Sequence, residues 1–320
     1  MRRSMKRTAF VTGAEGFIGS HLVRFLQAEG WNVIGGHRLH GVNSFPKLRN
    51  LEFIQCDLTN GQRVEEIFRK YEPTHVFHLG AQSLPTVSWA DPVSTFQSNI
   101  MGSLHIFEAA RHMRRHPPVV VSACSSAEYG NVPPSAIPVT EEQPLRPLHP
   151  YGISKVCLDL LAREYFLDYK IPAVNLRLFN TTGPGKTNDA PSDFVRQLIR
   201  IKKGMQDPVI EVGNLKPRRA FLDVKDTVRG FYLAAMKGHR GEAYNLCAET
   251  TQEVGELLRL AIRLSGLKVE VRQAASLMRP SDEKIIFGST KKIRKHTGWK
   301  PLLSLKQTLT SMLEYWDREM

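Results

Sequence analysis

Three glycines, each three residues apart, stand where a strand-like segment gives way to a helical one. Residues 8–12 favour a strand, and residues 20–29 have helical periodicity. Gly13 permits a tight turn, Gly16 lets another group approach the backbone closely, and Gly19 permits close helix packing. This spacing predicts a strand–turn–helix unit at the start of a parallel sheet.

The same alternation of strands and helices continues to about residue 180. Strands are expected at 31–35, 51–55, 75–79, 119–122 and 173–179, and helices at 62–71, 93–115 and 150–169. Strands that alternate with helices imply an α/β fold in which a doubly wound parallel sheet carries helices on both faces, the Rossmann architecture.

The sequence changes in character after Asn180. Residues 181–192 are rich in Gly, Pro and polar residues and indicate a loop. Beyond it we expect helices at 193–203, 224–237 and 251–265 and strands at 209–212 and 243–246. We therefore predict a Rossmann domain at 1–180, to which the chain returns around 223–250, and a smaller C-terminal α/β substrate domain at 181–222 and 251–320.

The glycine turn indicates a dinucleotide site, because free amides at a helix N-terminus attract a pyrophosphate. A purely structural turn is the alternative, and the strand before it and the helix after it favour binding. The expected pyrophosphate residues are Gly13, Gly16, Phe17, Ile18 and Gly19.

The end of the second strand indicates which cofactor binds. Gly35-Gly36-His37-Arg38 contains no carboxylate for a ribose 2′-hydroxyl, whereas Arg38 can bind a 2′-phosphate. We predict NADP(H); an ordinary surface arginine is the alternative reading of Arg38. Asp57 and Leu58 are expected near the adenine, and Leu79 and Ala81 along the cofactor cleft.

Tyr151 and Lys155 are four residues apart in the expected helix 150–169, so both project from one face. Pro150 suits the first turn of a helix. An ammonium near a phenol lowers the pKa of the phenol, which predicts a proton donor and acceptor that works near neutral pH. Alone, this pair is a weak pattern that also occurs on surface helices.

Composition limits the classes of protein. The chain is 42% hydrophobic and 23% charged, and it has no apolar run near the ~20 residues that cross a bilayer. Four scattered cysteines form no metal-type spacing, so we expect no metal site and free thiols in a reducing cytoplasm. The net charge of +13 suits an anionic ligand. It also raises the hypothesis of a nucleic-acid partner. The basic cluster at 291–300 lacks the aromatic residues of nucleic-acid sites, so no nucleic-acid partner is expected.

Together these segments resemble the extended short-chain dehydrogenase/reductase family, and the resemblance covers nearly the whole chain. The carrying motifs are Thr12-Gly13-Ala14-Glu15-Gly16-Phe17-Ile18-Gly19, Ser125-Ser126-Ala127-Glu128-Tyr129-Gly130 and Pro150-Tyr151-Gly152-Ile153-Ser154-Lys155. Further segments look like the branch of GDP-mannose 4,6-dehydratases and GDP-4-keto-6-deoxy-mannose reductases: Leu178-Phe179-Asn180, Gly183-Pro184-Gly185, Val212-Gly213-Asn214-Leu215, Arg279-Pro280-Ser281-Asp282-Glu283 and Thr297-Gly298-Trp299-Lys300-Pro301.

The resemblance implies roles for the matching positions. Tyr151 would donate the proton, Lys155 would bind the nicotinamide ribose, and Ser125 would bond the sugar oxygen that changes oxidation state. The residues expected to hold the nucleotide-sugar are Ser83, Ser126, Asn180, Arg219 and Arg279. Arg219-Ala220-Phe221 departs from the family's frequent Arg-Asp-Phe, which leaves the contacts of Arg219 open. Similar proteins pair their two long helices into a dimer, so we expect a homodimer.

The residue two after Ser125 separates reaction types. The family's dehydratases carry a carboxylate there, and this chain has Ala127, whose methyl group cannot transfer a proton. Glu128 follows, and in an extended segment it would point the other way. This favours an NADPH-dependent reductase of a 4-keto-6-deoxy nucleotide-sugar, and the resemblance implies that the sugar is GDP-linked. A dehydratase that uses Glu128, a 4-epimerase and a cofactor-binding regulator without chemistry are the alternatives.

Overall fold

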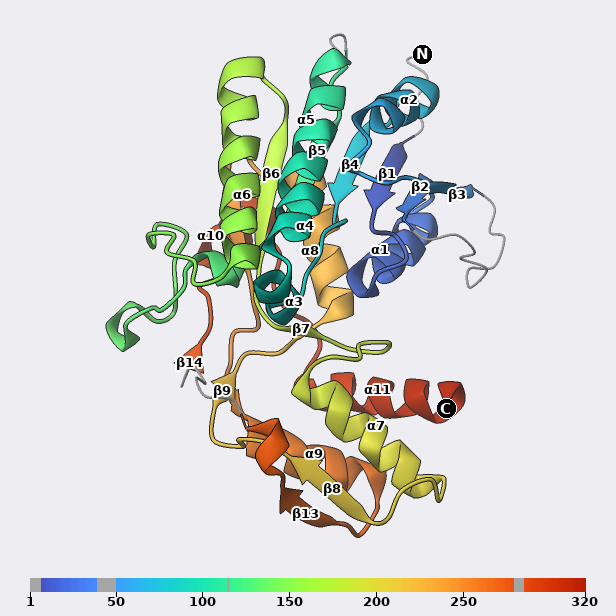
Figure 1. The fold of residues 1–320 in the computed structure, drawn as a ribbon, viewed down its shortest axis with the longest axis vertical. Coiled ribbons are helices and arrows are strands. Elements are labelled where there is room, and N and C mark those ends of the chain that lie inside the picture. The colour runs from blue at the N-terminus through green and yellow to red at the C-terminus, as the bar shows by residue number, and fades with distance from the viewer. Residues whose placement is uncertain (1–6, 39–49, 114–115, 279–284) are drawn as a thin grey trace.

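Seven parallel strands form the central sheet of the larger part of the molecule (Figure 1). The computed structural model describes residues 7–38, 50–113, 116–278 and 285–320. The strands are β1 (Thr8–Thr12), β2 (Asn32–His37), β3 (Leu51–Gln55), β4 (His75–His78), β5 (Val119–Ser125), β6 (Ala173–Leu178) and β11 (Ala243–Leu246). Their order is β11-β6-β5-β4-β1-β2-β3, and all neighbours run parallel. This confirms the predicted Rossmann class, in which ligands bind where the order reverses, here between β1 and β4.

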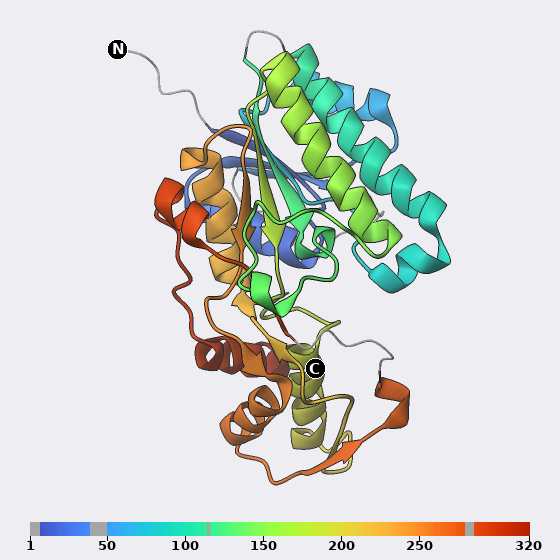
Figure 2. The ribbon, with the colours of Figure 1, turned by 90° about the vertical axis from the view of Figure 1, so that its left-hand side faces the viewer.

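Helices cover both faces of this sheet, as Figure 2 shows. One face carries α1 (Phe17–Ala28), α8 (Val224–Lys237) and α10 (Lys291–Thr297), and the other carries α2 (Gly61–Tyr71), α5 (Gly102–His112) and α6 (Pro150–Tyr169). Each face has its own apolar core. Leu22, Phe231 and Ile293 belong to the first core, and Phe68 and Phe107 to the second. The buried helix faces follow the 3.6-residue period that marked them in the sequence.

A smaller layer lies below the carboxyl ends of the strands (Figure 1). It contains α7 (Ala190–Lys202), α9 (Val254–Ser265), α11 (Leu305–Glu319) and the parallel pair β8 (Val209–Val212) and β13 (Glu270–Gln273). Phe194, Leu257 and Leu309 meet in its core. Short strands connect the two parts: β7 (Thr181–Thr182), β9 (Arg218–Arg219), β10 (Leu222–Asp223), β12 (Gln252–Glu253) and β14 (Ile285–Ile286).

The chain enters the large sheet a second time. β11 pairs with β6, and Trp299 from the C-terminal segment is fully buried in the core beside α8. β11 lies in the expected return to the first domain at 223–250, whereas Trp299 lies in the expected second domain and packs against the first one. The division at 181–222 and 251–320 stays a prediction.

Two expected elements are wrong in detail. The helix expected at 93–115 is three pieces, α4 (Pro92–Phe96), the π-helical segment η1 (Gln97–Met101) and α5, and its last two residues lie outside the described part of the chain. The loop expected at 181–192 begins with β7, and α7 already starts at Ala190, because the Asp189 carboxylate caps it by accepting the Ser192 N–H. Periodicity cannot detect a π turn or a two-residue strand.

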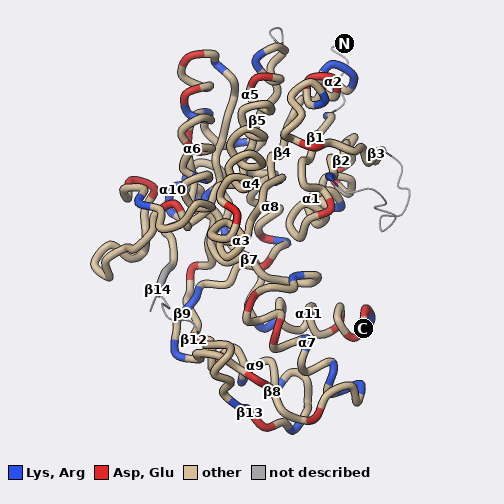
Figure 3. Tube along the Cα trace, in the orientation of Figure 1, with Lys and Arg blue, Asp and Glu red and all other residues tan. Residues whose placement is uncertain are grey.

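No helix within the described ranges is both long and apolar enough to cross a membrane. Lys and Arg are spread over both layers and alternate with Asp and Glu (Figure 3).

Candidate active site

The glycine turn has the form that its spacing predicts. Gly13 has a φ of +64°, and a Cβ there would lie 2.9 Å from the Cα of Gly80. A Cβ on Gly19 would lie 2.0 Å from the carbonyl oxygen of Gly13. Gly16 precedes α1 without a side-chain cap, and the first turn of α1 has no acidic residue. The amides of Phe17 and Ile18 therefore suit a pyrophosphate, and the cradle fits a dinucleotide.

The adenine end of the cleft places Arg38 beside Asp57. Arg38 is exposed just after β2, where its main-chain N–H donates to Oε1 of Glu15 at 3.2 Å. The Asp57 carboxylate accepts from the N–H of Thr59, and this bond lowers its pKa, with a smaller contribution from Arg38. An exposed guanidinium at this strand end fits a 2′-phosphate. Leu58 packs towards Gly80 at the same edge of the sheet.

A hydrogen-bond network fastens the β4 turn to the glycine turn. The hydroxyl of Thr12 accepts the N–H groups of Leu79 and Gly80 at 3.0 and 2.9 Å. It also bonds Nδ1 of His78 at 3.0 Å, and Nε2 of His78 lies 2.9 Å from Oγ of Ser103. The segment that carries Leu79 and Ala81 is thus held at the cofactor cleft.

Asn99 connects this cleft to α6, and sequence reasoning missed it. Its amide nitrogen donates to the carbonyl oxygen of Gln82 at 2.9 Å and to Oγ of Ser154 at 3.0 Å. Ser154 in turn donates to the carbonyl oxygen of Tyr151 at 2.7 Å. Asn99 lies in the π-helical segment η1, and such segments often occur at functional sites. No local pattern marks that segment.

Ser125, Tyr151 and Lys155 come together at the carboxyl end of β5. The Ser125 hydroxyl lies close enough to the Tyr151 phenol to act on its pKa. The Lys155 ammonium lies 5.9 Å from the centre of the Tyr151 ring and donates to the carbonyl oxygen of Ala123 at 2.8 Å. A proton donor, a hydroxyl and a buried cation thus come together, and the four-residue spacing had predicted this for Tyr151 and Lys155.

The expected lowering of the Tyr151 pKa is wrong for this structure. Burial raises the pKa of Tyr151 to about 12, although the nearby Ser125 hydroxyl opposes the shift. Burial also lowers the pKa of Lys155. Desolvation dominates because both groups lie in the protein interior and the ammonium bonds a main-chain carbonyl oxygen. The phenol is therefore protonated at neutral pH.

His149 caps the helix that carries these groups. Its Nδ1 accepts the N–H of Gly152 at 3.0 Å, and its ring stacks on Tyr151 with centroids 5.9 Å apart. Trp89 of α3 (Pro85–Ala90) packs edge-on against His149. These rings form an aromatic wall beside the phenol.

The sequence suggested that Glu128 points away along an extended segment, but the segment is not extended. Residues Ser126–Glu128 form the 3₁₀ turn η2, which brings Oε1 of Glu128 back to the main-chain N–H of Ser125 at 2.7 Å. Glu128 is completely buried, whereas Ala127 is partly exposed. The carboxyl group therefore lies behind the site and not in the cleft.

The described residues that we expect to bind substrate come from the turn after β4, from η2, from the end of β6 and from β9. Ser83 and Asn180 are exposed, and Ser126 is partly buried beside Ser125. Arg219 lies in β9 and donates to the carbonyl oxygen of Arg218 at 2.9 Å. Arg279 lies outside the described residues. Binding of substrate by these groups stays a prediction.

The smaller layer also contains a cavity of about 480 Å³. Its lining comes from α7, from β8 and β13 and from the segments next to them. The lining residues are Asp193, Gln197, Arg200, Gln206, Asp207, Val209, Glu211, Arg272 and Leu277. No local pattern marks these positions, because they meet only when β13 pairs with β8.

Known proteins with similar sequences and folds work on nucleotide-sugars. Residues 10–312 match the family model described as GDP-mannose 4,6 dehydratase. The chain is 29% identical to the GDP-6-deoxy-D-mannose reductase of Pseudomonas aeruginosa, over 98% of each chain. It is 28% identical to the GDP-mannose 4,6-dehydratase sdnI of Sordaria araneosa, over 96% of this chain and 60% of that protein. The structure of RMD from Pseudomonas aeruginosa complexed with NADPH superimposes with a TM-score of 0.85 at 28% identity, covering 98% of this chain and 100% of the other.

Proposed function

The chain belongs to the GDP-mannose 4,6-dehydratase family, and from this membership we propose that it is an NADPH-dependent reductase of a 4-keto-6-deoxy nucleotide-sugar, with GDP as the nucleotide. The family membership confirms the resemblance to extended short-chain dehydrogenases/reductases. Its members include reductases and dehydratases, so the reaction must come from the site.

The observation that carries the reductase proposal is the placement of the two residues after Ser126. An elimination of water needs a base for a carbon-bound proton and an acid for the departing hydroxyl. Ala127 has no titratable group, and Glu128 is fully buried with Oε1 on the Ser125 amide. Ketone reduction needs only one proton donor, and Tyr151 supplies it.

Each group of the site has a distinct part in that reaction. Bound NADPH supplies the hydride for the ketone carbon. The Tyr151 phenol, protonated at neutral pH, donates its proton to the developing alkoxide. The Ser125 hydroxyl lies beside that phenol and would orient the sugar oxygen. The Lys155 ammonium donates to the carbonyl oxygen of Ala123, and it would hold the nicotinamide ribose of a bound cofactor.

The cofactor preference rests on Arg38 and the glycine turn. Arg38 replaces the acidic residue that would bind a ribose 2′-hydroxyl, and its exposed guanidinium can pair with a 2′-phosphate. The similar Pseudomonas aeruginosa structure is described as complexed with NADPH. NADP(H) is the cofactor that fits this chain.

We also propose a homodimer through α6 and the helices beside it. Ile153, Leu160 and Leu167 are 42%, 56% and 45% exposed and lie seven residues apart, so they form one stripe on α6. Val93 and Met101, on the helical segments packed next to α6, are 65% and 43% exposed. A second copy of this face would bury the stripe. The four free thiols suit the predicted reducing cytoplasm, which stays a prediction.

The test is the absorbance of NADPH in a mixture of purified protein and GDP-4-keto-6-deoxy-mannose. Loss of the reduced-cofactor band in proportion to substrate supports the reductase. No loss, together with water elimination from GDP-mannose without added NADPH, would establish the dehydratase instead.

A further inference from the structure

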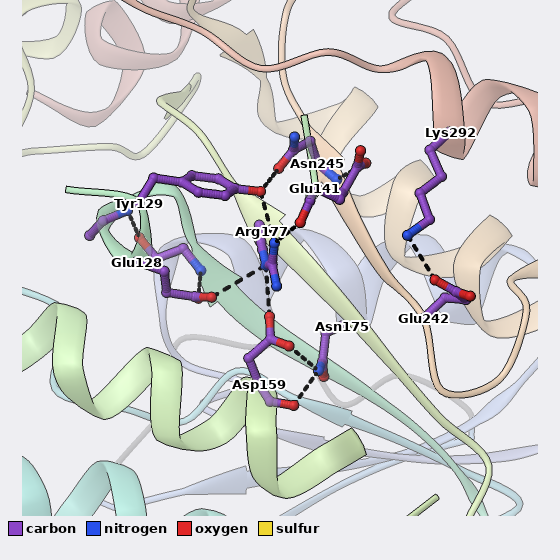
Figure 4. A network of polar contacts seen from close by, with 11 residues as sticks. Glu128, Tyr129, Glu141, Asp159, Asn175, Arg177, Glu242, Asn245 and Lys292 are labelled. Atoms are coloured by element: carbon purple, nitrogen blue, oxygen red, sulfur yellow. Dashed lines mark hydrogen bonds and ion pairs between the residues drawn. The ribbon is translucent and has the colours of Figure 1, made fainter. Parts of the chain in front are cut away.

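A buried ionic cluster joins the turn η2, which follows β5, to α6 and β6 (Figure 4). It consists of Glu128, Asp159 and Arg177, which we call the Arg177 cluster. Nε of Arg177 lies 2.8 Å from Oδ2 of Asp159 and 3.4 Å from Oε2 of Glu128. All three residues are at most 6% exposed. Buried charges are costly unless they are paired, so this arrangement has a strict geometry.

One end of the cluster holds the carboxyl end of β5. Oε1 of Glu128 accepts the main-chain N–H of Ser125 at 2.7 Å, and Oγ of Ser125 accepts the N–H of Ala127 at 3.2 Å. These reciprocal bonds form a capping box around the turn η2. The position of the Ser125 hydroxyl therefore depends on where the Glu128 carboxyl is held.

The other end of the cluster holds α6. Asp159 follows Lys155 by four residues and Tyr151 by eight, so the three lie on one face of the helix. Asp159 also bonds Asn175 of β6 at 3.2 Å. The ion pair between Arg177 and Asp159 thus ties the helix of the proton donor to the sheet.

Arg177 joins these two ends. It lies in β6 opposite Cys124, the neighbour of Ser125 in β5. Its NH1 group also donates to the phenol oxygen of Tyr129 at 3.0 Å and to the carbonyl oxygen of Glu141 at 2.9 Å. The side chain of Arg177 therefore projects from β6 and contacts the turn after β5, α6 and the loop that leads to α6.

We propose that Glu128 is a positioning residue that accepts the Ser125 N–H and, through Arg177 and Asp159, sets the Ser125 hydroxyl against the Tyr151 phenol without exchanging a proton with substrate. The proposal rests on the proposed reductase function, in which that pair acts on the sugar ketone.

The chemistry of the Glu128 carboxyl agrees with this role. Its pKa is raised well above the usual range because the group is buried and lies near Asp159. Sγ of Cys124 and carboxylate oxygens of Glu128 and Asp159 lie within 4.8 Å of one another. The guanidinium of Arg177 supplies the nearby positive charge. The amide oxygen of glutamine can accept the same N–H at nearly the same position as the Glu128 carboxyl oxygen.

The test compares three replacements in the full-length protein. Glu128→Gln keeps the acceptor oxygen and the length of the side chain, so its turnover should remain close to that of the wild type. Glu128→Asp keeps an ionisable group but is one methylene too short to reach the Ser125 N–H. Glu128→Ala removes the acceptor. Both should lower kcat by about 100-fold, the effect of an angstrom-scale misplacement, with little change in NADPH affinity.

The matched control is Glu141→Gln and Glu141→Ala. Glu141 is a partly buried carboxyl. Like Glu128 it accepts a main-chain N–H, that of Asn245 at 2.8 Å, but it does not contact Ser125. Loss of stability alone would lower activity in both alanine variants to a degree that follows the melting temperature. The proposal requires a kcat loss at Glu128 that exceeds the loss at Glu141 for the same change in melting temperature.

The opposite order of activities would overturn the proposal. If Glu128 transfers protons, the glutamine variant is inactive and the aspartate variant keeps part of its activity. Hydrogen–deuterium exchange of the peptide 119–130 gives an answer that needs no substrate. Exchange should be slow in the wild type and Glu128→Gln and faster in Glu128→Ala; equal exchange in all three refutes the contact. A wild type that fails to reduce the keto-sugar contradicts the proposed function alone, because exchange still tests the role of Glu128.

Discussion

The ammonium of Lys155 donates a 2.8 Å hydrogen bond to the carbonyl oxygen of Ala123, two residues before Ser125 in β5. This bond fixes the distance between the helix that carries Tyr151 and the strand that ends in Ser125. It also explains why Lys155 is 4% exposed and its pKa is lowered by burial. The active groups are thus held by the sheet and not by surface loops.

Tyr151→Phe removes the proton donor and leaves the ring in place. We expect kcat to fall by about 10²- to 10⁴-fold, the usual contribution of general acid catalysis, with NADPH affinity unchanged. Tyr165→Phe on the same helix, whose hydroxyl bonds Glu108, is the matched control and should keep its turnover. Steady-state kinetics and NADPH fluorescence titration measure both. Full activity of Tyr151→Phe would exclude the phenol as donor.

The pH dependence follows from the raised pKa of Tyr151. A phenol with a pKa of about 12 is protonated, and so able to donate, at every pH below that value. We therefore expect kcat/KM for NADPH to show no alkaline decline due to this group up to about pH 10, the ordinary pKa of tyrosine. A decline near neutral pH that disappears in Tyr151→Phe would mean that the pKa is low after all.

Arg38→Ala tests the cofactor preference. A charge-assisted hydrogen bond contributes about 1.5–3 kcal/mol, so NADPH should bind about 10- to 100-fold more weakly. NADH affinity should not change, because NADH has no 2′-phosphate. Arg69→Ala, an arginine of α2 that is 75% exposed, is the control and should affect neither cofactor. Equal losses for NADPH and NADH would contradict a role in 2′-phosphate recognition.

Gly19→Ala should abolish dinucleotide binding, because the new Cβ would lie 2.0 Å from the carbonyl oxygen of Gly13 and must displace the turn. Gly30→Ala provides the comparison. Gly30 has a φ of +79° and no atom within 4 Å of the new Cβ, so only backbone strain is added there. It should lower the melting temperature and keep NADPH affinity. Tight NADPH binding by Gly19→Ala would refute the close-packing argument.

Leu160→Glu places a charge in the middle of the apolar stripe of α6. In sedimentation velocity we expect the wild type to be a dimer and Leu160→Glu to be a monomer. The reason is that burying an unpaired carboxylate in an interface is costly. Leu302→Glu, at a leucine that is 60% exposed before α11, is the control and should remain dimeric. A wild-type monomer would contradict the proposed dimer directly.

Local sequence determined the elements of the fold and their class. The bounds that periodicity predicted are the observed ones for β1, β3, β8, β11, α6 and α8. An amphipathic helix or an apolar strand is recognised from a pattern of consecutive residues. The glycine turn was readable for the same reason, since Gly13 has a left-handed φ and a Cβ on Gly16 or Gly19 would meet the carbonyl oxygen of Gly13. The spacing of Tyr151 and Lys155 likewise fixes a shared helix face.

Tertiary structure alone decided the pKa values and the contacts of the residues at the candidate site. The pKa of Tyr151 rises because the surrounding fold buries the phenol, which four-residue spacing cannot reveal. Glu128 turns inward because Arg177, 49 positions along the chain, holds its carboxyl after β5 and β6 pair. Asn99 reaches Gln82 and Ser154 only through a π turn. Burial and charge pairing depend on residues that are distant in sequence, so they exist only once the chain has folded.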